Sequence, residues 1–406
     1  MSHNFPPEVN APASRTYEHA KCWAKMPGVR VTVVTNHPHH PYGILYPGYV
    51  NHWLTREKLD GIDVIRVKTY LAPNAGFARR TLNYLFFMIM AVTAAVRVPR
   101  FDVVIATSPQ FFCAMAGYLV SRLRRRPFIF ELRDLWPETI VTVEAIKPGP
   151  VIYLLDKLAS FLYHEASLIV PVTDAFKENL LKRGIPANKI QVIKNGVDLS
   201  FFQPQKAPQE LLDEIGARGR FVASYIGTVG LCHALDKIIF AAERLQYRKD
   251  ILFVIVGDGA QKHAIQKLVV SRGLQNVKVL PGVTKDKIRD YYALADINLV
   301  TLKKACLFET VIPSKIFEIM AMGRPILTTV DGECRQIIEA ADCGLFVEPE
   351  NVEKMSATIL DLTQKREMLK NMGENGRLFV EERFSRDVLA QNYIDILRSK
   401  VFHSIK

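Results

Sequence analysis

The sequence has few cysteines, and none is spaced to bind zinc. They are scattered, form no CxxC pair and have no histidine at the spacing of a zinc site. Most lie among apolar residues, which is typical of small core side chains. Unpaired cysteines of this kind are typical of proteins in a reducing cytoplasm, where structural disulfides are rare. The six cysteines are Cys22, Cys113, Cys232, Cys306, Cys334 and Cys343.

The sequence also lacks a hydrophobic run long enough to span a membrane. The strongly apolar residues 81–96 (TLNYLFFMIMAVTAAV) fall short of the roughly 20 that a spanning helix needs. A buried core helix is the first interpretation. A helix that also enters the membrane surface is the second, because Arg80 and Arg97 flank the segment. No signal peptide or stop-transfer pattern is present.

Low-complexity tracts and internal repeats are absent as well. With 406 residues, 49% hydrophobic and 23% charged, the chain has the size and composition of roughly two globular domains. Its net charge of +12 is uneven: residues 1–200 hold 24 Lys and Arg against 15 Asp and Glu, and residues 201–406 hold 29 against 26. A basic face of this kind can serve nucleic acid, an acidic substrate or anionic lipid, although a solvated surface is the commoner explanation.

Short apolar strands alternate with helices throughout, which predicts a doubly wound α/β fold. In the first half, the alternation of strands and helices ends near Asn195–Gly196. Residues 204–220 contain two prolines and no strand pattern, so they are expected to form a linker. We expect a first domain over 1–203, a second over 204–383, and a C-terminal helix over 384–406 that crosses back to the first. The expected strands lie in the segments RVTVVTN, IDVIRVKTY, DVVIATS, PFIFEL, SLIVPVT, FVASYIGTVG, LFVIVGDG, VKVLPG, INLVTL and ILTTV.

Residues 313–325 (PSKIFEIMAMGRP) carry the most informative pattern. Ser314 is expected to cap a helix that ends at Gly323, and a helix start suits a phosphate. Lys315 adds a full positive charge there. Glu318, one turn along the same face, could accept both hydroxyls of a ribose. The alternative is an ordinary amphipathic helix with both charges solvated.

Three further groups are weaker candidates. Ligands of open α/β sheets lie beyond the carboxyl ends of strands, where Gly257, Asp258 and Gly259 follow an apolar strand, although such turns are common. Arg133, Asp134 and Glu138 follow PFIFEL, with a structural salt bridge as the alternative role. The loop NHPHHPYG has His37, His39 and His40 but no nearby carboxylate or Cys, so a metal site is disfavoured there.

The ordered set of motifs resembles the retaining glycosyltransferases of family 4, which have the two-domain GT-B fold. The similar segments are FPPEVNAPASRTYEHA, FELRDLWPETI, VIKNGVD, YIGTVG, VGDG and PSKIFEIMAMGRPI, spread over nearly the whole chain. LRDLWPE and PSKIFE resemble a bacterial O-antigen and capsule subgroup, some of whose members are named N-acetyl-L-fucosamine transferases.

The resemblance implies transfer of a sugar from a UDP-sugar, with retention and without a metal or other cofactor. No DxD triplet is present, and positive groups would stabilise the leaving diphosphate. It implies catalytic roles for Glu318, Lys315 and Asp134, the last as a positioning group. Arg133, Asp134 and Glu138 would lie on the acceptor side. Donor-binding positions would be Gly227, Thr228, His233, Gly257, Asp258, Gly259, Glu309, Thr310, Ser314, Lys315 and Glu318.

The chain departs from the family pattern in three places. The first Glu of the EX7E motif falls at Thr310, with Glu309 one position earlier, so the sugar contact is in doubt. The family's Arg and Lys after the Gly227 position fall on Thr228 and His233, which reduces the positive charge. The expected first strand does not precede MSHNFPPEV, which suggests an upstream start or an impaired first domain.

The sequence therefore favours a glycosyltransferase of O-antigen or capsule synthesis, peripheral on the inner face of a bacterial plasma membrane. Its expected partners are a nucleotide sugar, a polyprenyl-diphosphate-linked acceptor and an anionic membrane surface, with no nucleic acid. The alternative is a catalytically impaired GT-B-like protein that only binds a nucleotide or a partner.

Overall fold

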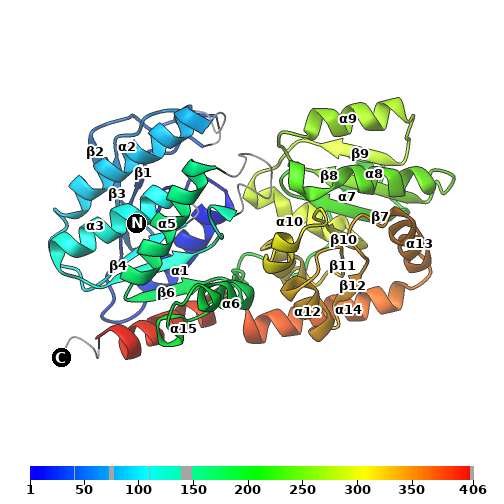
Figure 1. Cartoon of the computed structure of the whole chain (residues 1–406). Coiled ribbons are helices and arrows are strands. Elements are labelled where there is room, and N and C mark those ends of the chain that lie inside the picture. The colour runs from blue at the N-terminus through cyan, green and yellow to red at the C-terminus, as the bar shows by residue number, and fades with distance from the viewer. Residues whose placement is uncertain (41, 73–76, 109, 139–148, 403–406) are drawn as a thin grey trace. The chain divides into compact units, whose positions relative to one another are not determined.

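The chain forms two compact units in the computed structural model, which describes residues 1–40, 42–72, 77–108, 110–138 and 149–402 (Figure 1). Unit 1 comprises Met1–Lys194 and Arg386–Lys406, and unit 2 comprises Asn195–Ser385. Helices and parallel strands alternate in both units, so the predicted α/β class is confirmed.

Unit 1 is built from the expected strands and one more. Its elements are α1 Ala11–Ala24, β1 Thr32–Asn36, β2 Leu54–Leu59, β3 Ile62–Val67, α2 Phe77–Ala95, β4 Val104–Thr107, α3 Phe111–Arg124, β5 Phe128–Leu132, α5 Pro150–Glu165, β6 Leu168–Pro171, α6 Asp174–Lys182 and α15 Arg386–Leu397.

The strands of unit 1 form two separate sheets, ordered β1-β3-β2 and β4-β5-β6. All pairs are parallel except β2 with β3. Sequence analysis missed β2 because its residues, LTREKL, are mostly polar and only alternately exposed. The turn between β2 and β3, Asp60–Gly61, has positive φ at both residues, and an Asp-Gly pair is a recognised hairpin signal.

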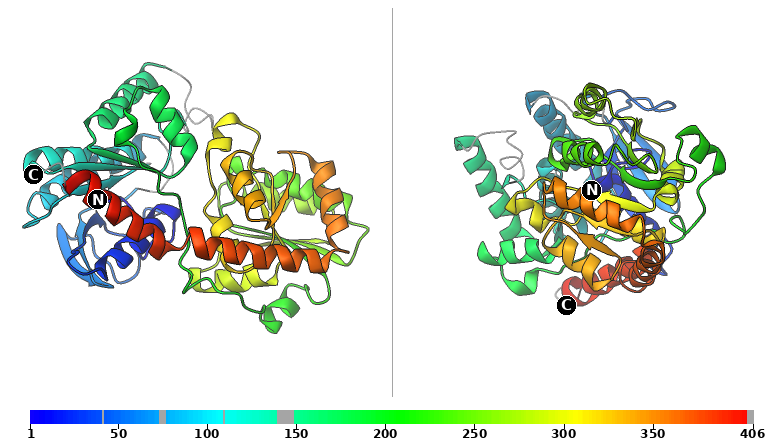
Figure 2. Two further views of the ribbon diagram at one scale, coloured as in Figure 1. Left: turned by 90° about the horizontal axis from the view of Figure 1, so that it is seen from below. Right: turned by 90° about the vertical axis from the view of Figure 1, so that its right-hand side faces the viewer.

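Helices cover both faces of the unit 1 strands. Val34 and Val104 pack with α2 and α3, whereas Ile129 and Leu168 pack with α15. Helix α15 lies beside α1, as the red and dark-blue helices show in Figure 2. With apolar side chains on both faces, the parallel strands are continuous hydrophobic runs, which explains why they were recognisable in the sequence.

Unit 2 holds a single six-stranded sheet. Its elements are α7 Gln209–Glu214, β7 Phe221–Ile226, α8 Leu235–Arg244, β8 Ile251–Val256, α9 Lys262–Ser271, β9 Val277–Leu280, α10 Lys285–Leu294, β10 Ile297–Val300, α11 Lys315–Ala321, β11 Ile326–Thr328, α12 Glu333–Ala340, β12 Gly344–Phe346, α13 Val352–Leu362 and α14 Arg366–Arg383.

This sheet is parallel, with the order β12-β11-β10-β7-β8-β9. The chain builds outward from β7 to β9 and then returns to the other side of β7 with β10. The strand order therefore reverses between β7 and β10. In open α/β sheets, ligands bind at the carboxyl ends of the strands beside such a reversal.

The segment expected as a linker, residues 204–220, contains the short helix α7. Leu211 and Leu212 pack against the core of unit 2, and Ile215 and Ala217 are buried in it. The segment is therefore folded onto unit 2.

Helix α2 has one buried and one exposed apolar face. Phe87, Met90 and Ala91 are buried, in agreement with the first interpretation of residues 81–96. Leu82, Leu85 and Ile89 are 47%, 37% and 53% exposed. Among the described residues, no helix meets the length and hydrophobicity that crossing a bilayer requires.

Candidate functional site

Three loops meet at the carboxyl edge of the unit 2 sheet. They follow β7, β8 and β10, at the point where the strand order reverses. The Val229 amide donates to the Asp258 carbonyl over 2.9 Å, joining the first two loops. The Lys303 amide donates to the Cys232 carbonyl over 2.8 Å, joining the first and third. Since α11 runs back against the strands, its first residues reach the same edge.

Glycines let the first two loops touch backbone to backbone. A Cβ built on Gly257 would lie 1.8 Å from the Gly227 carbonyl oxygen, and one on Gly259 would lie 2.4 Å from that of Val229. No side chain fits at such distances, so these glycines are required by close approach. The predicted GDG turn therefore has a structural role in shaping the loop around Gly227.

Lys315 points at the Gly227 loop. A Cβ on Gly227 would lie 2.6 Å from Lys315 Nζ, and this nitrogen lies 4.0 Å from the centroid of the Tyr225 ring. Burial lowers the pKa of Lys315 to about 8, although the charge of Glu318 acts in the opposite direction. The ammonium is thus held in dry surroundings over an aromatic face, where its attraction for an anion is strong.

Glu318 lies one turn further along α11 and is oriented by a buried tyrosine. The Tyr292 hydroxyl donates to Glu318 Oε2 over 2.7 Å. Tyr292 is only 1% exposed, so the contact fixes the carboxylate against a rigid part of the core. The second carboxylate oxygen adds acceptor capacity, as the predicted ribose contact requires.

The predicted capping role of Ser314 is wrong. Its backbone is already helical, with φ −58° and ψ −25°, and its hydroxyl makes no capping hydrogen bond. A capping side chain needs an extended backbone to reach back to the first turn. Helix α11 is also only seven residues long. The full charge of Lys315 therefore contributes more to anion binding than the helix dipole does.

The two positions that lack the family's Arg and Lys differ in exposure. Thr228 is exposed, whereas His233 is partly buried beside Cys232, with 3.5 Å between Nδ1 and Sγ. Burial and then the Lys315 charge lower the pKa of His233 to about 4, so the ring is neutral at neutral pH. His233 can donate a hydrogen bond there but supplies no positive charge.

The remaining predicted donor positions are more exposed. Asp258 accepts from the Gly282 amide over 2.7 Å and pairs with Lys262. Glu309 is exposed, and the Thr310 hydroxyl donates to the Leu307 carbonyl over 2.6 Å. Asp258 thus joins the loop after β8 to the loop after β9 and to the start of α9, while the Glu309 side chain is exposed to solvent.

Sequence reasoning missed Tyr225, Tyr292 and Lys303. The tyrosines lie in an apolar strand and an amphipathic helix, where an aromatic residue is indistinguishable from core. Lys303 is exposed, and its charge, like that of Lys315, acts on Cys232. Its position directly after β10 was the available signal, since strand ends supply ligand contacts.

In unit 1, two acceptor-side candidates belong to ion pairs. Arg133 lies 3.1 Å from Glu131, a carboxylate that also binds Arg15 over 2.6 Å. Burial alone would raise the pKa of Glu131, but Arg133 and Arg15 lower it to about 2. Glu138 pairs with Arg183. For Arg133 and Glu138 the alternative structural role is therefore realised, whereas Asp134 is half-buried.

The histidine loop is fastened by hydrogen bonds. Glu8 accepts from the amides of His39 and His40 over 3.0 and 2.9 Å, and His39 Nδ1 lies 2.9 Å from the His37 carbonyl. In the part of the chain that the structure describes, no cluster of three or more His, Cys, Asp or Glu residues could hold a metal ion. Pro41, in the same loop, lies outside the described residues, as do Thr139 and Ile140 of FELRDLWPETI.

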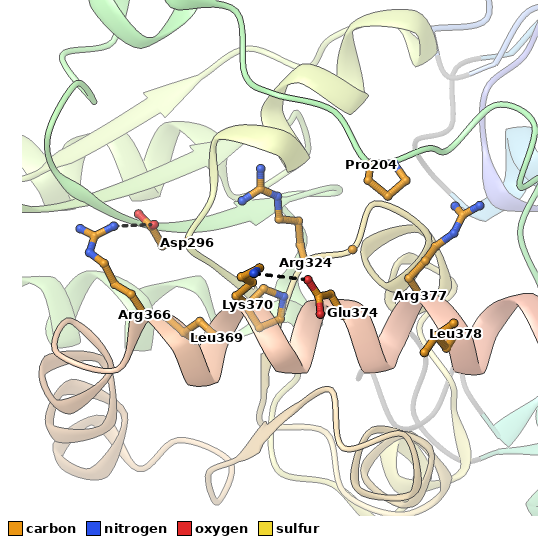
Figure 3. Close-up of a pocket in the computed structure, with 11 residues that line it drawn as sticks. Pro204, Asp296, Arg324, Arg366, Leu369, Lys370, Glu374, Arg377 and Leu378 are labelled. Carbon is orange, nitrogen blue, oxygen red and sulfur yellow. Dashed lines mark ion pairs between the residues drawn. The ribbon is translucent and has the colours of Figure 1, made fainter.

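A separate cavity of about 610 Å³ lies beside α14 (Figure 3). Asp296 and Pro325, which line it, precede β10 and β11, so it lies at the amino edge of the sheet. Figure 3 shows two ion pairs in its lining, Arg366 of α14 with Asp296 and Lys370 with Glu374 one turn along α14. This cavity is therefore distinct from the edge where Lys315 and Gly227 meet.

Two α/β units of this kind, each built around parallel strands, are the architecture of the GT-B class of proteins. Family comparisons agree. Residues 10–196 match the glycosyl transferase 4-like domain, and residues 209–379 match glycosyl transferases group 1. The chain is therefore a glycosyltransferase built from these two domains.

Individual relatives are distant in sequence but match most of the chain. A putative colanic acid biosynthesis glycosyl transferase, WcaI of Escherichia coli, is 22% identical over 97% of this chain and 98% of its own. An alpha-D-kanosaminyltransferase of Streptomyces kanamyceticus is 22% identical over 70% of this chain and 74% of its own.

Among solved structures, Anabaena Alr3699/HepE in complex with UDP and glucose has a TM-score of 0.72 at 16% identity, covering 98% of both chains. Sucrose-phosphate synthase from Thermosynechococcus elongatus has a TM-score of 0.73 at 15% identity, covering 98% of this chain and 95% of its own. These likenesses establish the GT-B fold.

Proposed function

We propose that this glycosyltransferase moves a sugar from a UDP-sugar to a lipid-linked acceptor, with retention at the anomeric carbon. The observation that carries the proposal is the position of Lys315, whose ammonium lies against Gly227 with Glu318 one turn away. In this arrangement the diphosphate contacts Lys315 and the Gly227 loop, and the ribose hydroxyls donate to Glu318. The Anabaena protein, solved with UDP and glucose, supports UDP as the nucleotide.

We propose further that Lys315, rather than a divalent metal, stabilises the leaving diphosphate. Its ammonium is desolvated and already in position before the donor binds. Little reorganisation energy is therefore required when negative charge develops on the leaving diphosphate. The leaving phosphate oxygen then accepts the proton of the acceptor hydroxyl on the same face of the sugar, as retention requires. In unit 1, the partly buried Asp134 is the proposed positioning residue for the acceptor. The donor sugar in this proposal is an N-acetylated amino or deoxy sugar.

The acceptor side of the proposal is a polyprenyl-diphosphate-linked sugar in surface-polysaccharide synthesis. The name of the Escherichia coli relative, which refers to colanic acid, supports this pathway class. Leu82, Leu85 and Ile89 form an exposed apolar stripe on α2, and Arg80 lies at its start. Such a stripe beside basic residues favours peripheral attachment to an anionic membrane, here the inner face of the plasma membrane.

Calorimetric titration with UDP in the presence of EDTA tests the donor site. We expect micromolar binding, weakened tenfold or more by Lys315→Ala and by Glu318→Ala, a loss of about 1.4 kcal/mol each. Lys278→Ala and Glu353→Ala, on exposed surface of unit 2, serve as matched controls and should leave binding unchanged. Equal affinities for all five proteins would contradict the proposed site.

A binding protein without transfer activity is the second candidate, because Thr310 replaces a family carboxylate and His233 is neutral. Release of UDP from a panel of UDP-sugars, with membrane extracts as acceptor, separates the two. UDP binding without any sugar-dependent release would favour the second candidate.

A further inference from the structure

A long loop joins β1 to β2 at the carboxyl edge of the β1-β3-β2 sheet in unit 1. It covers residues 37–53 (HPHHPYGILYPGYVNHW), and in the described part of it neither a helix nor a strand interrupts the chain. Loops longer than about 12–15 residues without secondary structure are uncommon in compact domains, where they are usually either functional or disordered. The contacts of the loop decide between these two explanations.

Hydrogen bonds fasten both ends of the loop to the rest of unit 1. Near its start, the His39 amide donates to Glu8 over 3.0 Å. Near its end, Asn51 Nδ2 donates to the Thr69 carbonyl over 2.8 Å, and Asn51 Oδ1 accepts from the Thr69 amide over 2.9 Å. Within the loop, the Gly43 amide donates to the His39 carbonyl over 2.8 Å. A loop held at these points is ordered, so a functional role is the explanation that remains.

The loop turns its large apolar side chains towards solvent although its backbone is held in place. Tyr42, Ile44, Val50 and Trp53 are 72%, 72%, 60% and 66% exposed. Side chains so exposed contribute little to the core, so packing within unit 1 does not account for these residue types. Exposed apolar side chains gathered on an ordered loop mark an interaction surface.

The Trp53 ring is positioned by contacts with the residue opposite it. The Lys68 amide donates to the Trp53 carbonyl over 3.1 Å, and Lys68 Nζ lies 5.2 Å from the centroid of the indole ring. The cation lies over the ring, which nevertheless stays two-thirds exposed. A rigid aromatic ring gives a large contact area at a low cost in conformational entropy, which makes it an effective anchor for a ligand.

The charge of the loop limits which ligands it can select. Residues 37–53 include no Asp, Glu, Lys or Arg, although the chain has a net charge of +12. Burial lowers the pKa values of His37, His39 and His40, so these three rings are neutral at neutral pH. Phosphates and anionic membranes are attracted by Lys and Arg, and a charged peptide is selected by opposite charges. The loop itself supplies none of these attractions.

A neutral saccharide fits such a surface. Sugar rings have C–H groups that pack on aromatic faces, and hydroxyls that exchange hydrogen bonds with polar side chains. The loop exposes partners of both kinds, the rings of Tyr42 and Trp53 and the polar groups of Tyr42 and His52. The exposed stripe of α2 differs, because it is aliphatic and has Arg80 near its start, as contact with an anionic membrane requires.

We propose that residues 37–53 bind a neutral oligosaccharide, the part of the acceptor beyond the sugar that receives the transferred unit, and that sugar rings stack on Trp53 and Tyr42. This assignment rests on the proposed function in one respect, namely that the acceptor carries a saccharide. The acceptor is then a glycan of several sugars. The enzyme therefore extends a chain that earlier sugar-transfer reactions have begun.

Retention of saccharides by the immobilised full chain tests this assignment. The probe is the saccharide pool that mild acid releases from a lipid extract of membranes of the source bacterium, divided by size into monosaccharides and oligosaccharides and labelled at the reducing end. We expect the unaltered protein to retain the neutral oligosaccharides in preference to the monosaccharides. Trp53→Ala and Tyr42→Ala should each lower this retention at least tenfold, and Trp53→Phe, which keeps an aromatic face, should restore part of it.

The matched control is Tyr153→Ala on α5 of unit 1. Tyr153 is 65% exposed and also has a lysine over its ring, with Lys157 Nζ 5.4 Å from the centroid, so its removal should leave retention unchanged. UDP affinity and the thermal unfolding midpoint, measured on every variant, show that the loop changes leave the fold and the donor site intact. Lys315→Ala should bind oligosaccharide normally, which separates this assignment from the donor site.

Three results would overturn the assignment. They are no retention of oligosaccharide by the unaltered protein, equal retention by the unaltered protein and Trp53→Ala, and a Trp53→Ala protein that keeps the oligosaccharide but no longer floats with anionic liposomes. The last result would make the loop a membrane contact. Absence of sugar transfer together with Trp53-dependent retention would instead contradict the proposed function and support the oligosaccharide surface.

Discussion

Lys315 combines a full charge with surroundings that make the charge depend on pH. Its Nζ lies over the Tyr225 ring and against Gly227. Burial lowers its pKa to about 8, so the ammonium starts to lose its proton just above neutral pH. Arginine in the same place would stay charged throughout this range.

We therefore expect UDP affinity to be constant below about pH 7.5 and to fall towards tenfold per unit above about pH 8.5. The sign follows because the anionic diphosphate binds the protonated lysine, and raising the pH removes that form. Calorimetry across this range measures the slope. Lys315→Arg should flatten it, and an unchanged slope in that variant would place the titrating group elsewhere.

Gly257 is the second residue on which the site depends. Gly257→Ala places a Cβ 1.8 Å from the Gly227 oxygen, which forces the two loops apart. We expect a loss of roughly 2–4 kcal/mol in unfolding free energy in urea and a loss of UDP binding. Gly184→Ala is the control, with φ +80° but no atom within 4 Å, and should cost only about 1 kcal/mol. Equal losses would contradict the close-approach argument.

At this scale the sequence identified Lys315 and Glu318 but not their partners. Helix spacing placed the two charges on one face because residues three and four apart are always neighbours on a helix. Tyr225 and Tyr292 come from β7 and α10, far away in the chain. Only the folded sheet brings them to α11, so no local pattern could reveal them.

At the scale of elements, α2 is the helix whose two faces differ in an unexpected way. Its inner face packs on β1 and β3, while Leu82, Leu85 and Ile89 repeat at intervals of three and four on the outside. Apolar positions at this spacing form one stripe. A helix at a water-exposed protein surface normally has polar residues on its outer face.

We expect the triple change Leu82→Gln, Leu85→Gln and Ile89→Gln to abolish flotation with anionic liposomes while leaving UDP affinity unchanged. Removing this apolar area deletes the part of the helix that would enter the acyl boundary. Val270→Gln on α9, an exposed apolar side chain of unit 2, is the matched control and should float like the unaltered protein. Failure of the unaltered protein to float at low salt would reject membrane attachment.

Most elements were predictable because buried parallel strands are short apolar runs between turn signals. The exceptions have local reasons. Strand β2 is an edge strand with alternating charges, so it lacked the apolar pattern. Ser314 was expected to cap α11, but the turn after Pro313 is already helical and leaves its hydroxyl without that role.

At the scale of the whole molecule, the chain returns to its first unit after completing the second. Helix α15 packs on α1, and Arg386 joins them through Glu18 Oε2 at 2.9 Å and His19 Nε2 at 3.2 Å. Side chains of Arg386 and Glu18 are 7% and 9% exposed. When one partner of a buried ion pair is removed, the other charge stays buried without a counter-charge, which is energetically costly.

We expect Arg386→Met to lower the unfolding free energy of unit 1 by about 3–5 kcal/mol in urea denaturation. Arg398→Met removes an exposed partner of Asp395 on the same C-terminal segment, and it should change stability by less than about 1 kcal/mol. Similar values for the two variants would show that the Arg386 pair does not hold α15 in place.

By itself, the sequence determined the alternation of strands and helices, the glycines that follow β7 and β8, and the charges on α11. These features depend on residues that are near neighbours in the chain, so propensity and spacing are enough to predict them. Tertiary structure decided which strands became neighbours, how far the pKa values of Lys315 and His233 fall, and that the strands of unit 1 divide between two sheets. Those outcomes depend on burial and on contacts between distant segments, which arise only when the strands pack in their spatial order.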